Sequence, residues 1–481
     1  MKSRPAVLVL IAAIVTTLVV LDRDVEAPGR GELGRAEVDA MPVADPTDVL
    51  ASTWYCAAGT ARAGGAANLT VVIANANETA VDGAVTWFPV GGEPVTTTVE
   101  LPASGSVSMA ATDAVAAEVV SAIVDVRGGA IAVEHVVSGE RGASVAPCAS
   151  DASPTWYFAN GTTERDARQV LALFNPFPDD VIVDIAFATE EGRAEPAALQ
   201  GYPVPAGSTA LVNVHDHVRR RAVTSTAVVA RAGRLVVDRI QSFDGVLGRR
   251  GVSLTLGAPV LSESWSFPEG YWADGLIEEW HVYNPSERDA EVSIEMVPVD
   301  GTTVEPIDLT VPARGRVTVA AATAERVPAG IFHSSSVVSL NGVPVVVERL
   351  LDARPPSPRR GWSSALGSPL ARPAWLLPLG EVSGNTDEWV VVHNPGADAV
   401  TVSFTALAGG QVLAVSGLQD LEIAPGERLQ VRIGNHIERS PLPLLVQATG
   451  DVVVERDLYR VNEPGISAVM GIPLAVAEAG P

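Results

Sequence analysis

The chain has little lysine, cysteine, histidine and aromatic side chain. Of its 33 basic residues all except Lys2 are arginine, and only 5% of its residues are aromatic. The near-absence of lysine indicates the base composition of the gene rather than a chemical requirement. The sequence also lacks a phosphate-binding loop, an EF-hand, a zinc-ligand spacing and a dinucleotide fingerprint. We therefore predict no cofactor, no metal site and no catalytic residue.

Two short motifs bear on this prediction. His215-Asp216-His217 would place two imidazoles on one face of a strand, which suits a metal. No third ligand is visible, and three arginines follow at 219–221 and would repel a cation. Four Gly-x-Ser motifs lack the second glycine of a nucleophile elbow, because Ala146, Thr255, Ala365 and Val469 stand there.

Acidic residues outnumber basic ones by 57 to 33, which gives a net charge of −24. This charge disfavours nucleic acid and anionic membrane surfaces as partners. It serves solubility, with cation binding or repulsion from an anionic cell wall as the alternative reading.

The N-terminus resembles an export signal. Lys2 and Arg4 precede the uncharged apolar run Ala6–Leu21, which places the N-terminus in the cytoplasm and the rest outside. No clear cleavage site follows, so residues 1–21 are expected to be a signal anchor, a single transmembrane helix; cleavage and secretion is the alternative. Residues 22–50 are rich in Asp, Glu, Gly and Pro, and are expected to form a flexible acidic linker.

One pattern of residues occurs four times at intervals of roughly 105 residues, which indicates one domain type in tandem. Each copy opens with a tryptophan, reaches an asparagine that ends an apolar run, and closes on Gly-x-Ser. The repeated residues are Trp54, Trp156, Trp265 and Trp375, followed by Asn75, Asn175, Asn284 and Asn394. Proline follows the asparagine in three copies, a strong turn signal.

Short alternating apolar runs separated by Gly/Pro turns predict an all-β chain. We expect four tandem antiparallel β-sandwich (Ig-like) domains after the N-terminal transmembrane helix, arranged as a rod. Their predicted ranges are 51–152, 153–262, 263–372 and 373–477. The alternative is a four-bladed propeller, although a blade needs only about 40–50 residues.

An acidic-basic pair ends an apolar strand in every copy. The pairs are Glu134-His135, Asp238-Arg239, Glu348-Arg349 and Glu455-Arg456. Neighbours on a strand point to opposite faces, so one member is expected to meet a cross-strand partner while the other is solvated. Structural pairing is favoured over a ligand-binding arginine, just as a core role for each tryptophan is favoured over a sugar-stacking platform.

The two cysteines, Cys56 and Cys148, lie at opposite ends of the first repeat. Cys148 occupies the position held by Gly257, Gly367 and Gly471 in the other copies. An exported chain favours a disulfide between them, with two buried free thiols as the alternative.

The segments between each tryptophan and the asparagine-ending strand differ from copy to copy. They read as loops, and in a sandwich such loops form the usual binding rim. These segments are interpreted as ordinary solvated loops, with a polar or cation-dependent contact surface as the alternative. The acids in question are Glu164, Asp166, Asp274, Glu278, Glu381 and Asp387.

The run Trp156–Thr162, then Phe174-Asn175-Pro176 and Val236–Arg239, resembles a sandwich-like repeat of bacterial surface proteins. With the anchor and the four-copy layout, the chain resembles a membrane-anchored actinobacterial family of unknown function. The resemblance implies no catalytic residue. We expect a non-enzymatic, extracytoplasmic scaffold or binding protein of the cell envelope with an envelope protein or glycan as partner; the alternative is an extracytoplasmic enzyme or accessory factor acting on envelope glycans.

Overall fold

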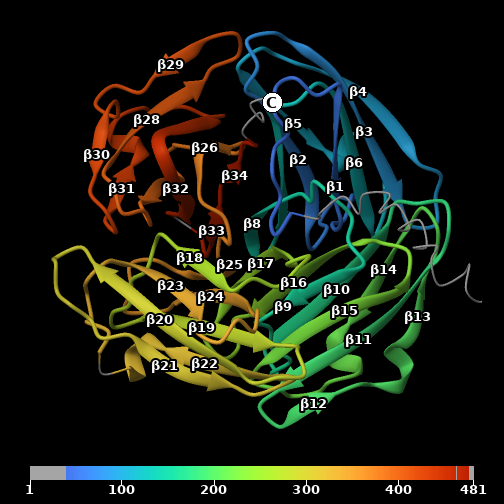
Figure 1. The fold of residues 1–481 in the computed structure, drawn as a ribbon. Coiled ribbons are helices and arrows are strands. Elements are labelled where there is room, and N and C mark those ends of the chain that lie inside the picture. The colour runs from blue at the N-terminus through green and yellow to red at the C-terminus, as the bar shows by residue number, and fades with distance from the viewer. Residues whose placement is uncertain (1–38, 325, 462, 476–481) are drawn as a thin grey trace, which may run out of the picture. The chain divides into compact units, whose positions relative to one another are not determined.

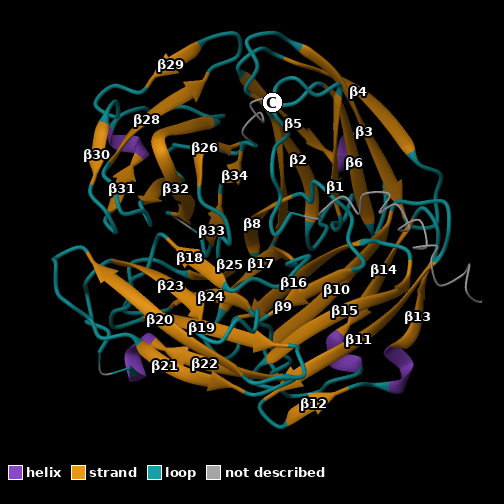
Figure 2. Ribbon diagram, viewed as in Figure 1, coloured by secondary structure: helices purple, strands orange, loops and turns teal. Residues whose placement is uncertain are grey.

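Antiparallel β-strands make up nearly all of the regular structure (Figure 2). The computed structural model describes residues 39–324, 326–461 and 463–475. Within these ranges the only helices are five single 3-10 turns: η1 (Ala111–Asp113), η2 (Ala197–Leu199), η3 (Val214–Asp216), η4 (Ala321–Thr323) and η5 (Ile433–Asn435). The all-β prediction is therefore confirmed. In the same ranges no helix has the length and hydropathy to cross a bilayer, and the expected signal anchor at 1–21 lies outside them.

The first and third repeats each consist of two four-stranded antiparallel sheets. In the first repeat the sheet orders are β1-β6-β3-β4 and β5-β2-β7-β8, and in the third β18-β23-β20-β21 and β22-β19-β24-β25. The strands of the first repeat are β1 (Ala51–Cys56), β2 (Asn68–Asn75), β3 (Val81–Pro89), β4 (Val95–Leu101), β5 (Gly105–Ala110), β6 (Val120–Arg127), β7 (Ile131–Gly139) and β8 (Gly142–Pro147). Those of the third are β18 (Ser264–Phe267), β19 (Leu276–Asn284), β20 (Ala290–Pro298), β21 (Ile307–Val311), β22 (Gly315–Ala320), β23 (His333–Ser339), β24 (Val346–Ala353) and β25 (Gly361–Leu366).

The second and fourth repeats follow the same plan with short additional edge strands. The second pairs the sheet β9-β15-β11-β12, with β13 also on β11, with the sheet β14-β10-β16-β17. In the fourth, the long strand β32 takes part in both sheets, next to β26 and β28 in one and next to β27 and β33 in the other. The strands of the second repeat are β9 (Thr155–Phe158), β10 (Ala167–Asn175), β11 (Val181–Thr189), β12 (Gly192–Ala194), β13 (Gln200–Val204), β14 (Ser208–Asn213), β15 (Thr224–Ala232), β16 (Val236–Asp244) and β17 (Arg250–Leu256). Those of the fourth are β26 (Arg372–Leu377), β27 (Thr386–His393), β28 (Val400–Leu407), β29 (Val412–Ala414), β30 (Leu421–Ile423), β31 (Arg428–Arg432), β32 (Leu444–Arg460), β33 (Ile466–Met470) and β34 (Ile472–Pro473).

The two sheets of a repeat share one apolar core. In the first repeat, Trp54 and Val85 of one sheet pack with Val71 and Ile73 of the other. All four opening tryptophans are buried, with at most 1% of their surface exposed. The indole N–H of Trp265 donates to the Val345 carbonyl at 2.9 Å, so that the ring packs without leaving its polar atom unpaired.

The repeated asparagine joins two turns of each repeat. In the third repeat, the Nδ2 of Asn284 donates to the carbonyls of Arg288 (2.7 Å) and Val311 (3.0 Å). Its Oδ1 accepts the backbone N–H of Ser286 at 3.0 Å. The same three kinds of bond are made by Asn75, Asn175 and Asn394. Fully buried, the side chain satisfies backbone groups that the turns leave without ladder partners.

The closing strands of the four repeats contact one another in a cycle. β8 contacts β17, β17 contacts β25, β25 contacts β33, and β33 returns to β8 (Figure 1). The expected rod is therefore wrong, since a rod would leave the first and fourth repeats apart. A closed cycle of repeats is a feature of the propeller alternative. In this structure, however, each unit of the cycle is a pair of sheets and not the single sheet of a propeller blade.

The serine of the Gly-x-Ser motif forms a hydrogen bond to the closing strand of the neighbouring repeat. The hydroxyl oxygens of Ser144, Ser253 and Ser363 accept backbone N–H groups from the following repeat at 2.9–3.1 Å. The preceding glycine allows the close approach: a Cβ on Gly361 would lie 2.8 Å from the backbone nitrogen of Gly465, and its φ of +136° disfavours a side chain.

Residues 39–50, part of the expected flexible linker, are packed against the repeats. Ala44 forms a parallel bridge with Leu474, and its N–H donates to the Pro473 carbonyl at 2.9 Å. Met41 is buried, and the Ser368 hydroxyl lies 3.2 Å from its sulfur. For these residues the expected spacer is wrong, because small and apolar side chains here find partners in the third and fourth repeats; residues 22–38 lie outside the described ranges.

Candidate binding pocket and buried charge network

The acidic-basic pairs join the repeats in a second cycle. Each basic side chain binds the acid of the next repeat: His135 to Asp238 (2.9 Å), Arg239 to Glu348 (2.6 Å), Arg349 to Glu455, and Arg456 to Glu134 (2.8 Å). All eight side chains are at most 1% exposed. The expectation that one member of each pair is solvated is therefore wrong. Each member instead has a buried partner in a neighbouring repeat, the acid in the preceding one and the base in the following one.

Each acid of this cycle also accepts a backbone N–H from the preceding repeat. The donors follow the opening strand of that repeat: Ala57 to Asp238, Ala159 to Glu348, Glu269 to Glu455 and Leu379 to Glu134, at 2.8–3.2 Å. Two kinds of donor offset the desolvation of each buried carboxylate. The charge pairs thus hold neighbouring repeats together, although some of their buried atoms, such as Asp238 Oδ1 and Arg456 Nη1, have no hydrogen-bond partner among the described residues.

The pKa of Arg349, one of the bases of this cycle, is shifted by its acidic neighbours. Burial acts to lower the pKa of the Arg349 guanidinium, but the carboxylates of Glu455 and Glu278 outweigh burial and raise it. These neighbouring acids therefore favour the charged form of the Arg349 guanidinium.

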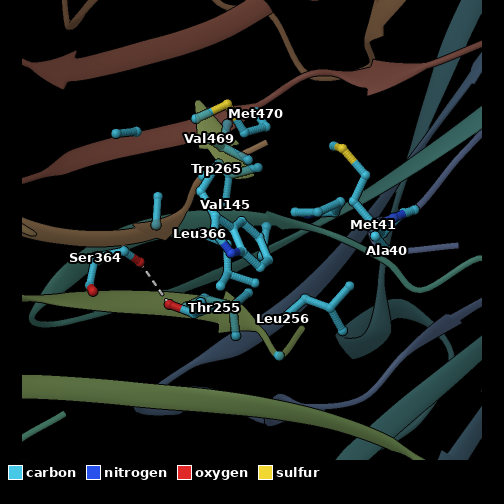
Figure 3. A pocket seen from close by; sticks show the side chains of 18 residues that line it. Ala40, Met41, Val145, Thr255, Leu256, Trp265, Ser364, Leu366, Val469 and Met470 are labelled. Carbon is cyan, nitrogen blue, oxygen red and sulfur yellow. Dashed lines mark hydrogen bonds between the residues drawn. The ribbon is translucent and has the colours of Figure 1, made fainter. Parts of the chain in front are cut away.

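An apolar pocket lies where the four closing strands meet. Its cavity volume is about 50 Å³, and it is lined by residues of β8, β17, β25 and β33, together with Trp265 of β18. Met41 lies at one side of the pocket and Val469 and Met470 of β33 at another (Figure 3). The packed N-terminal segment therefore contributes a wall of the pocket alongside all four repeats.

The residues that line the pocket are mostly apolar. No Cys, His, Lys, Arg, Asp or Glu is among its lining residues. The Thr255 hydroxyl donates to the Ser364 carbonyl at 2.8 Å (Figure 3). The Ser364 hydroxyl donates to Glu348 at 2.7 Å. Both hydroxyls are therefore engaged within the protein, and what remains is a largely apolar surface for an apolar group.

Buried acids outside the charge cycle gather in the third and fourth repeats. Burial raises the pKa of Glu388 to about 7, and one of its carboxylate oxygens has no hydrogen-bond partner among the described residues. Asp457 occupies a position that is Val136, Ile240 or Leu350 in the other repeats. Burial, then the charges of Glu455 and Glu269, raises its pKa well above the usual range. Both carboxyls hold protons more tightly than exposed acids do.

His215 and His217 do not lie on a strand as expected. His215 belongs to η3, which ends at Asp216, and His217 follows it. Neither belongs to a metal-binding group of side chains among the described residues.

Most of the acids considered for a cation-binding rim are paired with basic side chains. Asp166 and Glu164 bind Arg249, Glu278 lies 3.1 Å from His333, and Asp387 and Glu381 bind Arg432 and Arg460. Asp274 is exposed. These loops therefore offer few free carboxylates to a cation.

Cys56 and Cys148 form a disulfide with an S–S distance of 2.08 Å. His135 Nδ1 lies 3.3 Å from the sulfur of Cys148. Among the described residues these three form the one group close enough to hold a metal, although in the disulfide form the sulfurs are bonded to each other. The sequence did not predict that His135 lies beside the disulfide, nor the pocket, nor the burial of Asp457. Only the histidine at position 135, where the other repeats have arginine, could have indicated the special environment of the disulfide.

Residues 112–244 match a protein family described as "Family of unknown function (DUF5719)". No curated protein matches the chain. Among solved structures, a red sea bream transglutaminase is 14% identical over 46% of this chain and 32% of its own, with a TM-score of 0.10; the match thus spans about a third of that enzyme. A tetra-tandem repeat from the extending region of a large adhesion protein is 11% identical over 88% of this chain and 100% of its own (TM-score 0.09). SGBP-B from a xyloglucan utilization locus of Bacteroides uniformis is 11% identical over 87% and 99% (TM-score 0.12).

Proposed function

We propose that the chain is a non-enzymatic binding or scaffolding protein of the bacterial cell envelope. The observation that carries this proposal is the apolar pocket at the meeting point of the four closing strands. Its walls come from all four repeats, so that the pocket exists only when the cycle is closed. A ligand in the pocket and closure of the repeats then favour one another, because anything that binds the closed form alone stabilises it.

The expected alternative, an enzyme acting on envelope glycans, finds little support in this pocket. Its lining has no general acid or base, and its two named hydroxyls are engaged within the protein. The buried carboxyls with raised pKa, Glu388 and Asp457, are not among the residues that line it.

The N-terminal sequence and the repeat pattern support the remaining parts of the proposal. Lys2, Arg4 and the apolar run Ala6–Leu21 fit an uncleaved signal anchor with the repeats outside the cytoplasm. The paired sheets and the buried opening tryptophan fit an Ig-like sandwich unit. A membrane-anchored actinobacterial family built from such repeats remains the family to which we assign the chain by this proposal.

Site-specific photo-crosslinking in a bacterial host tests the binding function. A photoreactive phenylalanine is placed at Leu366, which lines the pocket, and as a control at Leu211, which is 43% exposed on β14. We expect a discrete crosslinked species from position 366 and none from position 211. Equal crosslinking at both positions, or none at 366, would refute pocket binding.

Membrane fractionation tests the proposed location. An anchored chain is found in the membrane fraction with the peptide that contains Lys2 intact, and its repeats are digested by protease added to spheroplasts. A soluble chain that lacks residues 1–21 would instead support secretion.

A further inference from the structure

Three residues that set the first repeat apart from the other copies converge on one place, together with an unusual acid of the second repeat. Cys56 stands where the other repeats have Phe158, Phe267 and Leu377, and Cys148 stands where they have glycine. His135 replaces an arginine, and its partner Asp238 is the one aspartate in a cycle whose other acids are glutamates. The side chains of all four are fully buried.

The disulfide alone has a packing explanation. In the second and third repeats an aromatic ring covers the glycine so closely that an added Cβ would lie 2.8 Å from Phe158 and 2.7 Å from Phe267. In the first repeat the disulfide occupies this space instead. This packing does not require a histidine beside the sulfur, nor an aspartate in place of the glutamate of the other repeats. The presence of His135 and Asp238 therefore needs a separate explanation.

The imidazole is held between a sulfur and a carboxylate. His135 Nε2 lies 2.9 Å from Asp238 Oδ2, and the same oxygen accepts the Ala57 N–H at 3.2 Å. The other ring nitrogen, Nδ1, lies 3.3 Å from Cys148 Sγ. A carboxylate on one imidazole nitrogen is the usual means of presenting the other nitrogen to a metal.

We propose that reduction of the disulfide converts this place into a zinc site. Its ligands are the thiolates of Cys56 and Cys148 and the Nδ1 of His135, with Asp238 orienting the ring. A dithiol reductant supplies two electrons and two protons, which break the S–S bond to give two thiols and leave the reductant as its disulfide. Zn²⁺ then displaces one proton from each thiol, and a water completes the tetrahedron.

The distances require little movement of the ligands. With bonds of about 2.3 Å to sulfur and 2.0 Å to nitrogen, a tetrahedral ion separates sulfur from nitrogen by about 3.5 Å and the two sulfurs by about 3.8 Å. The first separation nearly exists, and all three ligand atoms lie within 4.8 Å of one another. The two sulfurs, freed from their bond, have to move apart.

The charges fit a buried site. Two thiolates and a neutral imidazole balance the charge of Zn²⁺, and such soft and borderline ligands favour zinc over calcium or magnesium. Asp238 keeps its hydrogen bond to the imidazole in both states. The two cysteines of the first repeat are thus joined by a disulfide under oxidising conditions and by a zinc ion under reducing conditions.

Cobalt(II) substitution tests the proposal on the full-length chain in mild detergent. The protein is reduced with a phosphine without oxygen and titrated with Co²⁺ and then Zn²⁺. We expect one Co²⁺ per chain, with tetrahedral d–d bands and a thiolate charge-transfer band, both removed by Zn²⁺. The oxidised protein is expected to show neither band.

Three variants separate the designed site from chance binding. His135→Arg restores the residue of the other repeats and should weaken Co²⁺ binding at least tenfold, and Asp238→Asn should weaken it by about 10–100-fold. His215→Ala, in another repeat, should bind as the parent does.

The double variant Cys56→Phe/Cys148→Gly restores the packing of the second and third repeats and should fold without binding Co²⁺. The proposal would be overturned if the reduced parent showed no bands or if His135→Arg showed unchanged bands. It would also be overturned if the reduced parent lost its near-ultraviolet dichroism and Co²⁺ did not restore it.

Discussion

The Arg456–Glu134 ion pair closes the cycle of repeats, and its removal is the most direct test of that closure. The two residues are 322 positions apart, and Arg456 Nη2 contacts both carboxylate oxygens at 2.8 and 2.9 Å. Neither side chain is exposed. Arg456→Met keeps the apolar stem and removes the charge, so that Glu134 keeps only the Leu379 N–H as a strong donor.

The expected cost follows from the burial of the pair. Breaking one side of a buried ion pair costs about 3–5 kcal/mol, because the remaining charge is desolvated without compensation. Replacing both partners costs far less, so Arg456→Met/Glu134→Gln should recover most of the loss. The amide oxygen that this double variant carries at position 134 can still accept the Leu379 N–H, while the buried charge is gone.

Urea denaturation followed by tryptophan fluorescence and far-ultraviolet dichroism measures both variants. An exposed pair, Arg314–Glu287, supplies the control, since Arg314→Met should change the unfolding free energy by less than about 1 kcal/mol. An Arg456→Met variant that is as stable as Arg314→Met would show that the pair does not hold the cycle closed. A double variant no more stable than the single one would contradict the unpaired charge of Glu134 as the source of the loss.

Three further predictions concern individual side chains. Burial raises the pKa of Glu388 from 4.5 to about 7, so the folded chain binds a proton there more tightly, and the free energy of unfolding falls as pH rises between these values. Glu388→Gln should remove this fall and raise the free energy of unfolding by on the order of 2–3 kcal/mol at about pH 8. Equal slopes of unfolding free energy against pH in both proteins would contradict this prediction. Asn284→Ala should cost about 2 kcal/mol in urea denaturation because it leaves buried carbonyls unpaired, whereas Thr302→Ala in an exposed loop should cost little. Alkylation of the denatured, unreduced chain followed by intact-mass measurement should find no modified cysteine; two modified thiols would exclude the disulfide.

Features that depend on local chemistry can be predicted from the amino-acid sequence. Period-two runs between Gly/Pro turns specified antiparallel strands, because side chains of a strand alternate between two faces. The asparagine that ends each such run marked a turn, and in the structure its side chain bonds to a backbone N–H two residues on and a carbonyl four residues on. Cys56 and Cys148, at the two ends of one repeat, were sufficient to predict the disulfide.

How the repeats are joined depends on contacts between residues that are far apart in the sequence. The pair Glu348-Arg349 looks the same in a rod and in a closed cycle, because each member's partner lies more than 100 residues away. The Gly-x-Ser serine likewise has no local partner; it accepts an N–H from the neighbouring repeat. The apolar pocket exists because four closing strands meet, and no single copy of the pattern contains it. Four copies of one sequence pattern thus specified the unit, while contacts between copies decided the assembly.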